Sequence, residues 1–276
     1  MLPTPSTSHV DLNRIYEPAE DSYLLLDTLS SVTEREFLTR RFSDKDYVDT
    51  PNPPPFIVEV GVGSGIVLAF ITAQARAIFG REDIVALGTD VNVFACRAAE
   101  ETISQACRET NIPKHDANKP PIFSTICADL TTPLRLGVAD VLIFNPPYVP
   151  SESTPGIRSI DVADDILSHA DNFKLSVKSF EQDSYLLSLS YAGGLDGMEV
   201  TNRFLEDLPT VLDQHQGVAY ILLCQQNKPD EMVQRIRTWG EDWDVKIVGR
   251  SGKKAGWEKL FIVRIWRIQR PTIAGQ

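Results

Sequence analysis

Residues 56–65 read Phe56-Ile57-Val58-Glu59-Val60-Gly61-Val62-Gly63-Ser64-Gly65. The first five residues are mostly apolar and predict a buried β-strand, and the glycines after them predict a tight turn into a helix over residues 66–79. Glycines at such a turn let the backbone approach a ligand at the carboxyl edge of a parallel sheet. A glycine-rich turn that binds nothing remains the alternative, so the rest of the chain has to decide.

Strand-like and helix-like segments alternate along most of the chain. Further strands are predicted at residues 84–89, 122–127, 139–144 and 217–224, and an antiparallel pair is predicted at 243–248 and 259–266. Helices are predicted over residues 16–29, 93–109, 183–191, 198–212 and 229–240. This alternation predicts an α/β fold, a doubly wound seven-stranded and mostly parallel sheet in a single domain over residues 1–276. Residues 1–13 are expected to be a mobile tail, residues 39–55 a surface loop, and residues 150–183 an irregular insertion.

Composition limits the classes of partner and the cellular compartment. With 42% hydrophobic and 24% charged residues, the chain has the composition of an ordinary soluble globular protein, and it contains no run of eighteen apolar residues for a membrane span. The 4 cysteines have no metal-binding spacing, which argues against a metal site and favours a reducing compartment, the cytoplasm or also the nucleus. The net charge of −11 repels phosphate backbones and disfavours nucleic acid as a partner.

Acidic residues end two of the predicted strands. Asp90 follows the second strand and is placed to accept hydrogen bonds from two ribose hydroxyls. Asp129 and Leu130 follow the third strand, where the carboxylate could accept from an adenine amino group while the leucine packs on the ring. Each aspartate taken singly could be no more than a strand cap. Together with the glycine turn they indicate a site for an adenosine ligand without phosphates.

The fourth strand ends in Asn145-Pro146-Pro147-Tyr148. The two prolines fix the backbone and remove two N–H donors, so the carbonyls there cannot join a continuing strand. A planar, uncharged NH2 group could be held at this turn, because Asn145 and the Pro146 carbonyl would accept its hydrogens and Tyr148 would stack on its face. A strand end with ordinary proline turn chemistry is the alternative.

These motifs together resemble the class I S-adenosylmethionine-dependent methyltransferases, which have a Rossmann-like sheet. More narrowly, the chain resembles the eukaryotic and archaeal HemK-like release-factor glutamine methyltransferases. The resemblance extends from residue 16 to about residue 265, and it rests on Tyr16-Glu-Pro-Ala-Glu-Asp-Ser22, Glu59-Val-Gly-Val-Gly-Ser-Gly65, Asp90, Asp129-Leu130, Asn145-Pro-Pro-Tyr148, Ala192-Gly-Gly-Leu-Asp-Gly197 and Lys254-Ala-Gly-Trp-Glu-Lys-Leu260. Ser22 stands where related sequences often have threonine, which keeps the hydroxyl.

The resemblance implies a role for each matching residue. The catalytic turn would be Asn145, Pro146, Pro147 and Tyr148, with Asn145 and Tyr148 touching the substrate. The residues implied to bind S-adenosylmethionine are Tyr16, Ser22, Glu59, Gly61, Gly63, Gly65, Asp90, Asp129, Leu130 and Asn145. The start of a helix at residues 17–22 could receive the methionine carboxylate of this cofactor. No metal is implied.

The implied reaction is N5-methylation of the glutamine in the Gly-Gly-Gln motif of the class-1 translation termination factor. Adenine N6 of DNA offers the same amino group, but it requires a flipped base and a basic groove that an acidic chain does not favour. Histone lysine is a lesser alternative, because an ammonium must lose a proton before it attacks. A non-catalytic cofactor-binding subunit is the alternative outside enzymes, and the intact Asn145–Tyr148 tetrad argues against it.

The resemblance also implies a partner, a small zinc-binding activator protein shared among methyltransferases. The strand from Ile122 to Cys127 is expected to be an edge of the sheet, and edge strands invite pairing with a second chain. The alternative is that the loop at residues 109–121 covers this edge.

Overall fold

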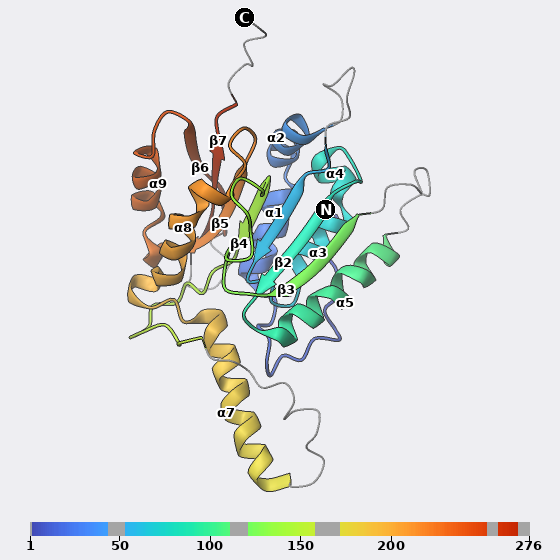
Figure 1. The fold of residues 1–276 in the computed structure, drawn as a ribbon, viewed down its shortest axis with the longest axis vertical. Coiled ribbons are helices and arrows are strands. Elements are labelled where there is room, and N and C mark those ends of the chain that lie inside the picture. Colours follow the sequence, from blue (N-terminus) through green and yellow to red (C-terminus); the bar gives the residue numbers. More distant parts are fainter. Residues whose placement is uncertain (1, 44–52, 111–120, 158–171, 253–258, 270–276) are drawn as a thin grey trace, which may run out of the picture.

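The structure, a computed structural model, describes residues 2–43, 53–110, 121–157, 172–252 and 259–269. Within these residues a seven-stranded sheet has the order β3-β2-β1-β4-β5-β7-β6 (Figure 1). Its strands are β1 Phe56–Val60, β2 Val85–Asp90, β3 Ile122–Cys127, β4 Val141–Phe144, β5 Val218–Cys224, β6 Trp243–Arg250 and β7 Leu260–Arg267. The strands from β3 to β5 pair in parallel, and β7 pairs antiparallel with both β5 and β6. The predicted fold class and the antiparallel C-terminal pair are therefore confirmed.

The order of the strands reverses at the middle of the sheet. Strand β1 pairs with β2 on one side and with β4 on the other, and the chain leaves the two middle strands in opposite directions. Val60 of β1 lies beside Phe144 of β4, so the glycine turn and Asn145 start from the same level of the sheet. A reversal of this kind opens a crevice at the carboxyl ends of the strands, where doubly wound folds bind their ligands.

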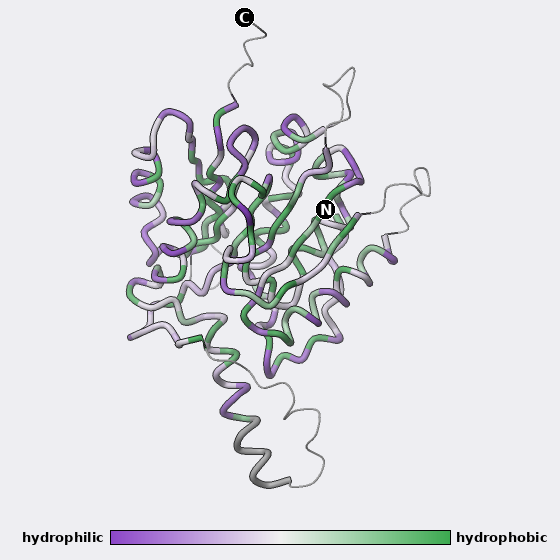
Figure 2. The backbone as a smooth tube through the Cα atoms, viewed as in Figure 1, coloured by the Kyte–Doolittle hydropathy of each residue, from purple (hydrophilic) through white to green (hydrophobic). Residues whose placement is uncertain are grey.

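Helices cover both faces of the sheet. They are α1 Glu20–Ser30, α2 Val32–Phe42, α3 Ile66–Ala73, α4 Ala75–Phe79, α5 Val93–Glu109, α7 Asn172–Tyr191, α8 Glu199–Val211 and α9 Pro229–Arg237. Helices α1 to α5 pack on one face and α8 and α9 on the other, because successive strand residues such as Ile57 and Val58 point to opposite sides. Figure 2 shows the hydrophobic residues concentrated along the central strands, and α7 extends away from this body (Figure 1).

A buried ionic cluster fastens α2 to the sheet. Both carboxylate oxygens of Glu34 accept from Arg264 Nη1 of β7, at 2.9 and 2.7 Å, and Oε2 also accepts from the Tyr220 hydroxyl of β5 at 2.8 Å. The Arg264 guanidinium lies over the Phe37 ring at 3.6 Å. All three polar side chains are buried, so loss of one would leave an uncompensated group in the core. The cluster joins the first and last parts of the chain.

Several local predictions differ from the structure. Helix α2 was not predicted, and it occupies residues 39–42 of the expected loop, while residues 44–52 lie outside the described residues. The helix expected over residues 66–79 is divided into α3 and α4 at Gln74, whose backbone is not helical. Helix α7 begins at Asn172, so the insertion predicted to be irregular up to residue 183 is helical in its last part. Two predicted segments lie in part outside the described residues, namely the insertion at residues 158–171 and the loop before β3 at residues 111–120.

The N-terminal segment packs on the body of the molecule, in contrast to the predicted mobile tail. Val10 and Ile15 are buried in a small cluster with Ala95 of α5. His9 Nε2 lies 3.1 Å from the Ala98 carbonyl oxygen in the same helix. The following helix α1 begins at Glu20, four residues later than predicted, and Pro18 precedes it. The chain is therefore held against α5 before it reaches the crevice.

Candidate active site

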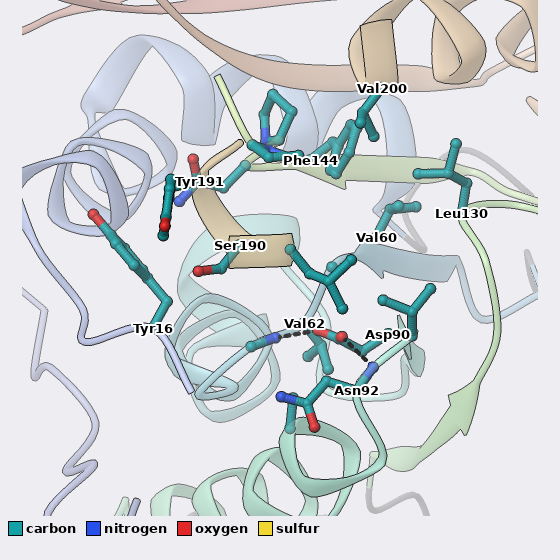
Figure 3. A pocket seen from close by; sticks show the side chains of 18 of the residues that line it. Tyr16, Val60, Val62, Asp90, Asn92, Leu130, Phe144, Ser190, Tyr191 and Val200 are labelled. Atoms are coloured by element: carbon teal, nitrogen blue, oxygen red, sulfur yellow. Dashed lines mark hydrogen bonds between the residues drawn. The ribbon is translucent and has the colours of Figure 1, made fainter. Parts of the chain in front are cut away.

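A pocket of about 470 Å³ lies at the carboxyl ends of the central strands. Its size suits a nucleoside-sized ligand together with a substrate side chain. The predicted site residues that line it are Tyr16, Ser22, Glu59, Gly61, Gly63, Asp90, Asp129, Leu130, Asn145, Pro146, Pro147 and Tyr148. In Figure 3, Tyr16 and Tyr191 lie at one side of the pocket, and Leu130 and Val200 lie at the other. The topology thus brings together residues that the sequence spreads over more than 130 positions.

Gly65 is the one predicted residue that does not line the pocket. Its φ is +78°, and a Cβ added there would lie 2.5 Å from the Ala99 Cα atom of α5. Gly61 and Gly63 also have positive φ, 65° and 51°, and they do line the pocket. The glycine turn therefore has two structural roles, since Gly61 and Gly63 form part of the pocket wall and Gly65 lets α3 pack closely against α5.

Asp90 is held by the glycine turn and by the start of α5. Its Oδ2 accepts from the Gly63 N–H at 2.9 Å and its Oδ1 accepts from the Asn92 N–H at 2.8 Å (Figure 3). Burial raises the pKa of Asp90, and these backbone N–H groups lower it in part. The bonds fix both oxygens while their remaining lone pairs stay available in the pocket wall. This geometry fits an acceptor of two ribose hydroxyls.

Glu59 is the second buried carboxyl group of the pocket. Its Oε2 accepts from the Leu68 N–H of α3 at 2.8 Å. Burial raises the pKa of Glu59 well above its usual range, and the nearby charge of Asp90 raises it further, although the Leu68 N–H acts in the opposite direction. Glu59 therefore ties the end of β1 to the first turns of α3, which holds the glycine turn in place.

Asp129 and Leu130 follow β3 at the far side of the pocket. Asp129 Oδ2 accepts from Arg203 Nη2 of α8, and Arg203 also lines the pocket. Leu130 has a φ of +49°, a conformation that costs free energy for a branched residue, and its carbonyl oxygen accepts from the Thr89 hydroxyl at 2.9 Å. Strain of this kind at a pocket wall is typical of a residue positioned for a ligand.

Asn145 presents a buried acceptor to the pocket. Its Nδ2 donates to Asp21 Oδ2 at 3.2 Å, whereas its Oδ1 is buried and has no hydrogen-bond partner among the described residues. An unsatisfied buried polar atom costs roughly 1–3 kcal/mol, so it marks a position where a ligand donor is expected. The atom fits the predicted acceptor for a planar NH2 group.

The turn after Asn145 is held by hydrogen bonds from Asn227, which lies outside the lining of the pocket. Asn227 Nδ2 donates to the Tyr148 carbonyl oxygen and to the Asp196 carbonyl oxygen, both at 2.9 Å. A Cβ added to Gly197 would lie 2.0 Å from the Tyr148 oxygen, so only glycine permits this approach. The segment Ala192-Gly193-Gly194-Leu195-Asp196-Gly197 therefore clamps the proline turn through backbone contacts.

The N-terminal segment closes the pocket near α1. Asn92 Nδ2 donates to the Arg14 carbonyl oxygen at 2.8 Å, which sets Tyr16 in the pocket wall. The Ser22 N–H and hydroxyl both donate to Asp21 Oδ1, at 2.6 and 3.2 Å. The start of α1 therefore offers fewer free N–H groups to the carboxylate of a ligand than the sequence predicts, because the Ser22 N–H already donates to Asp21.

Three functional candidates were not found from the sequence. Asp21, Arg203 and Asn227 each bond to a predicted site residue, and each lies on or beside a helix where its residue type is usually solvated. Among the described residues, His, Cys, Asp and Glu form no group suited to a metal ion. No described helix has the length and apolar character needed to cross a membrane.

The sheet order, with its antiparallel β7, and a pocket at the reversal of the strands define the class I methyltransferase fold. No protein-family model matches the chain. The chain is 31% identical over 97% of both lengths to the eRF1 methyltransferase catalytic subunit mtq2 of Schizosaccharomyces pombe. It therefore belongs to the HemK-like family of class I S-adenosylmethionine-dependent methyltransferases that includes mtq2 and HEMK2.

Two further relatives agree with this assignment. Methyltransferase HEMK2 of Mus musculus is 28% identical over 92% of this chain and 94% of its own length. A putative protein N5-glutamine methyltransferase of Methanocaldococcus jannaschii is 28% identical over 92% of both chains. The similarity thus covers nearly the whole length of the relatives.

Proposed function

We propose that this chain methylates the side-chain nitrogen of a protein glutamine, namely that of the Gly-Gly-Gln motif of the class-1 translation termination factor in the cytoplasm. The observation that carries the proposal is the buried Asn145 Oδ1 without a partner, an acceptor suited to one N–H of a carboxamide. The names of two relatives, one an eRF1 methyltransferase subunit and one a putative protein N5-glutamine methyltransferase, support the same substrate class.

The residues of the pocket fit S-adenosylmethionine. Asp90 would accept from the ribose hydroxyls, and Asp129 would accept from the adenine amino group while Leu130 packs on the ring. Tyr16 and Ser22 would enclose the methionine end, near the start of α1. When bound, this cofactor supplies an electrophilic methyl group on a sulfonium.

The protein's own contribution to the reaction is mainly positioning. A carboxamide nitrogen is a weak nucleophile, because its lone pair is delocalised into the carbonyl. Asn145 Oδ1 and the Pro146 carbonyl would each accept one N–H of the substrate amide, which turns the lone pair toward the methyl donor. Tyr148 would stack on the flat face of the amide. Fixed dipoles of this kind stabilise the positive charge that develops on nitrogen without reorganising during the reaction.

Charge favours a protein substrate over DNA. A DNA methyltransferase must hold a phosphate backbone beside a flipped base, and a chain with a net charge of −11 repels it. A lysine ammonium carries three donors, whereas the turn presents acceptors matched to the two hydrogens of a neutral amide. A flexible glutamine loop flanked by basic residues is the substrate that suits an acidic enzyme.

We also propose that a small zinc-binding activator protein pairs with strand β3. This strand is at the edge of the sheet, and its Ile122 and Ile126 side chains are 65% and 41% exposed. An apolar strand at the edge of a sheet favours pairing with a second chain. The name of the Schizosaccharomyces pombe relative, a catalytic subunit, supports an assembly of more than one chain.

The deciding experiment is methyl transfer from radiolabelled cofactor to an intact termination factor. The matched control is the same factor with its Gly-Gly-Gln changed to Gly-Gly-Asn, with duplex DNA and histones as rival substrates. The chain is tested alone and co-expressed with the activator. The proposal is supported if the termination factor with its Gly-Gly-Gln intact is labelled and the Gly-Gly-Asn factor, the DNA and the histones are not. Label on DNA or histones but not on the factor would refute it, and cofactor binding without any transfer would identify a non-catalytic subunit.

A further inference from the structure

Asp21 connects the N-terminal helix to the catalytic turn. Its carboxylate is only 2% exposed, and its Oδ2 accepts from Asn145 Nδ2, a residue 124 positions away in the chain. Its other oxygen, Oδ1, accepts from the N–H and the hydroxyl of Ser22. Both oxygens are therefore committed, and the carboxylate is held from the α1 side while it contacts Asn145.

The direction in which an asparagine points depends on such a neighbour. The amide of Asn145 can present either its oxygen or its NH2 group to the pocket, and the two arrangements differ by a half-turn of the side chain. A carboxylate only accepts hydrogen bonds, so the NH2 group must face Asp21. This leaves Asn145 Oδ1 as the buried atom without a partner in the pocket wall.

We propose that Asp21 is a positioning residue that fixes Asn145 with its oxygen, and not its NH2 group, toward the reacting nitrogen. The proposal rests on the proposed function in one respect, that the reacting group is a planar NH2. Without Asp21 the Asn145 side-chain amide can rotate by a half-turn. Its NH2 group would then face the NH2 group of the substrate. The carboxylate also polarises the Asn145 amide through the hydrogen bond, which increases the negative charge on Oδ1.

The simpler interpretation is that Asp21 serves only the helix, since acids in the first turn interact favourably with the helix dipole. The neighbouring Glu20 makes it possible to distinguish an effect on the helix dipole from an effect on Asn145. It lies in the same first turn and carries the same charge, but it is exposed and does not line the pocket. Glu20→Gln is therefore a matched control for any effect that arises through helix α1 alone.

An exchange of the two side chains gives the sharpest test. Asp21→Ala is expected to lower kcat by about 10²-fold, the scale for loss of one preorganised polar contact, and Glu20→Gln to leave it unchanged. Asn145→Asp places two carboxylates against each other and should also lose about 10²-fold. The double variant Asp21→Asn/Asn145→Asp exchanges the two side chains. The asparagine introduced at position 21 then donates to the aspartate introduced at position 145, and the second oxygen of that aspartate faces the substrate as an acceptor.

The double variant should regain about tenfold in kcat over Asn145→Asp, which is the coupling expected of residues in one hydrogen-bond network. A purely structural role of Asp21 predicts no such recovery. A double variant no faster than Asn145→Asp would overturn the proposal. The dissociation constant of S-adenosylhomocysteine should stay within about threefold of wild type in Asp21→Ala, so that the effect is on kcat.

A measurement without substrate separates this inference from the proposed function. In protein labelled with ¹⁵N-asparagine, the side-chain NH2 signal of Asn145 is identified by its loss in Asn145→Asp. Its hydrogen exchange should accelerate at least tenfold in Asp21→Ala and stay unchanged in Glu20→Gln. Equal exchange in Asp21→Ala and wild type would refute the inference. Failure of the wild type to methylate the termination factor would refute only the proposed function.

Discussion

The Arg203 guanidinium forms a salt bridge with Asp129, so the carboxylate that follows β3 is tied to helix α8 on the other side of the sheet. Asp129 is thereby presented to the pocket in one orientation, although it belongs to a loop between strands. Arg203 is half exposed, whereas Asp129 is more protected. This wall of the pocket, where we propose that adenine binds, is therefore built by two residues that are 74 positions apart in the chain.

Loss of this salt bridge should weaken cofactor binding modestly. Arg203→Ala is expected to raise the dissociation constant of S-adenosylhomocysteine about two- to fivefold, because partly exposed ion pairs contribute little. Calorimetric titration measures this, with Arg237→Ala, an exposed arginine on α9, as the control. An analogue with hypoxanthine in place of adenine should lose less affinity through Arg203→Ala. This analogue lacks the amino group from which Asp129 would accept a hydrogen bond.

Asn145→Ala tests the catalytic turn directly. Removal of the acceptor should lower kcat by roughly 10²-fold or more, the scale of one preorganised polar contact, while the affinity for cofactor stays nearly intact. Steady-state rates and a separate binding titration give the two quantities. Unchanged turnover in this variant, with cofactor still bound, would contradict the proposed mechanism.

Cofactor affinity should fall as the pH is lowered. Burial raises the pKa of Asp90 above its ordinary value, and only the ionised carboxylate can accept from both ribose hydroxyls. Binding is therefore strong above the raised pKa and weakens as the pH falls through it, with protons released on binding in that range. Calorimetry over a series of pH values, from the ordinary pKa of an aspartate at about 3.9 upward, measures this.

Asp90→Asn is the control for that pH dependence. The variant should bind weakly at neutral pH, and its affinity should change less with pH because the titrating group is absent. Burial still raises the pKa of Glu59 in this variant, although the contribution of the Asp90 charge is lost, so a remaining pH dependence is expected from Glu59. A pH profile identical to that of the wild type would show that Asp90 does not control binding.

Gly65→Ala should destabilise the fold without altering a ligand contact. The new Cβ would overlap Ala99 at 2.5 Å and adopt a φ of +78°, which together cost about 3 kcal/mol in the free energy of unfolding. Gly137→Ala has a similar φ of +64° with nothing within 4 Å, so it should cost only about 1 kcal/mol. Urea denaturation measures the free energy of unfolding of the two variants. The difference between them gives the cost of the overlap with Ala99, because both variants carry the strain of a positive φ.

The sequence was most informative where polar residues follow buried strands. Asp90, Asp129 and Asn145 could be predicted to lie at one pocket because parallel strands deliver the residues after them to one edge of the sheet. Helix α2 could not be predicted, since two of its buried residues are the charged Glu34 and Arg41, and the pattern of apolar residues therefore gave no helical periodicity.

The residues that were missed share one physical cause. Asp21 and Arg203 are charged residues on helices that bury their apolar residues, where a solvated charged side chain is the usual outcome. Asn227 lies in a short turn after β5. Each acquires its role only through a contact with a residue 70 or more positions away, and no local pattern of residues specifies such a contact.

The position of β7 bears on how the protein is made. This strand is the last in the chain, yet it lies between β5 and β6, and it supplies Arg264 to the buried Glu34 of α2. While a nascent chain emerges from the ribosome, β6 has no neighbour and Glu34 has no cation until residue 264 has been synthesised and has left the exit tunnel. The native sheet can therefore close only after β7 has been translated, and a chain halted before β7 would expose the edge of β5 to chaperones and proteases.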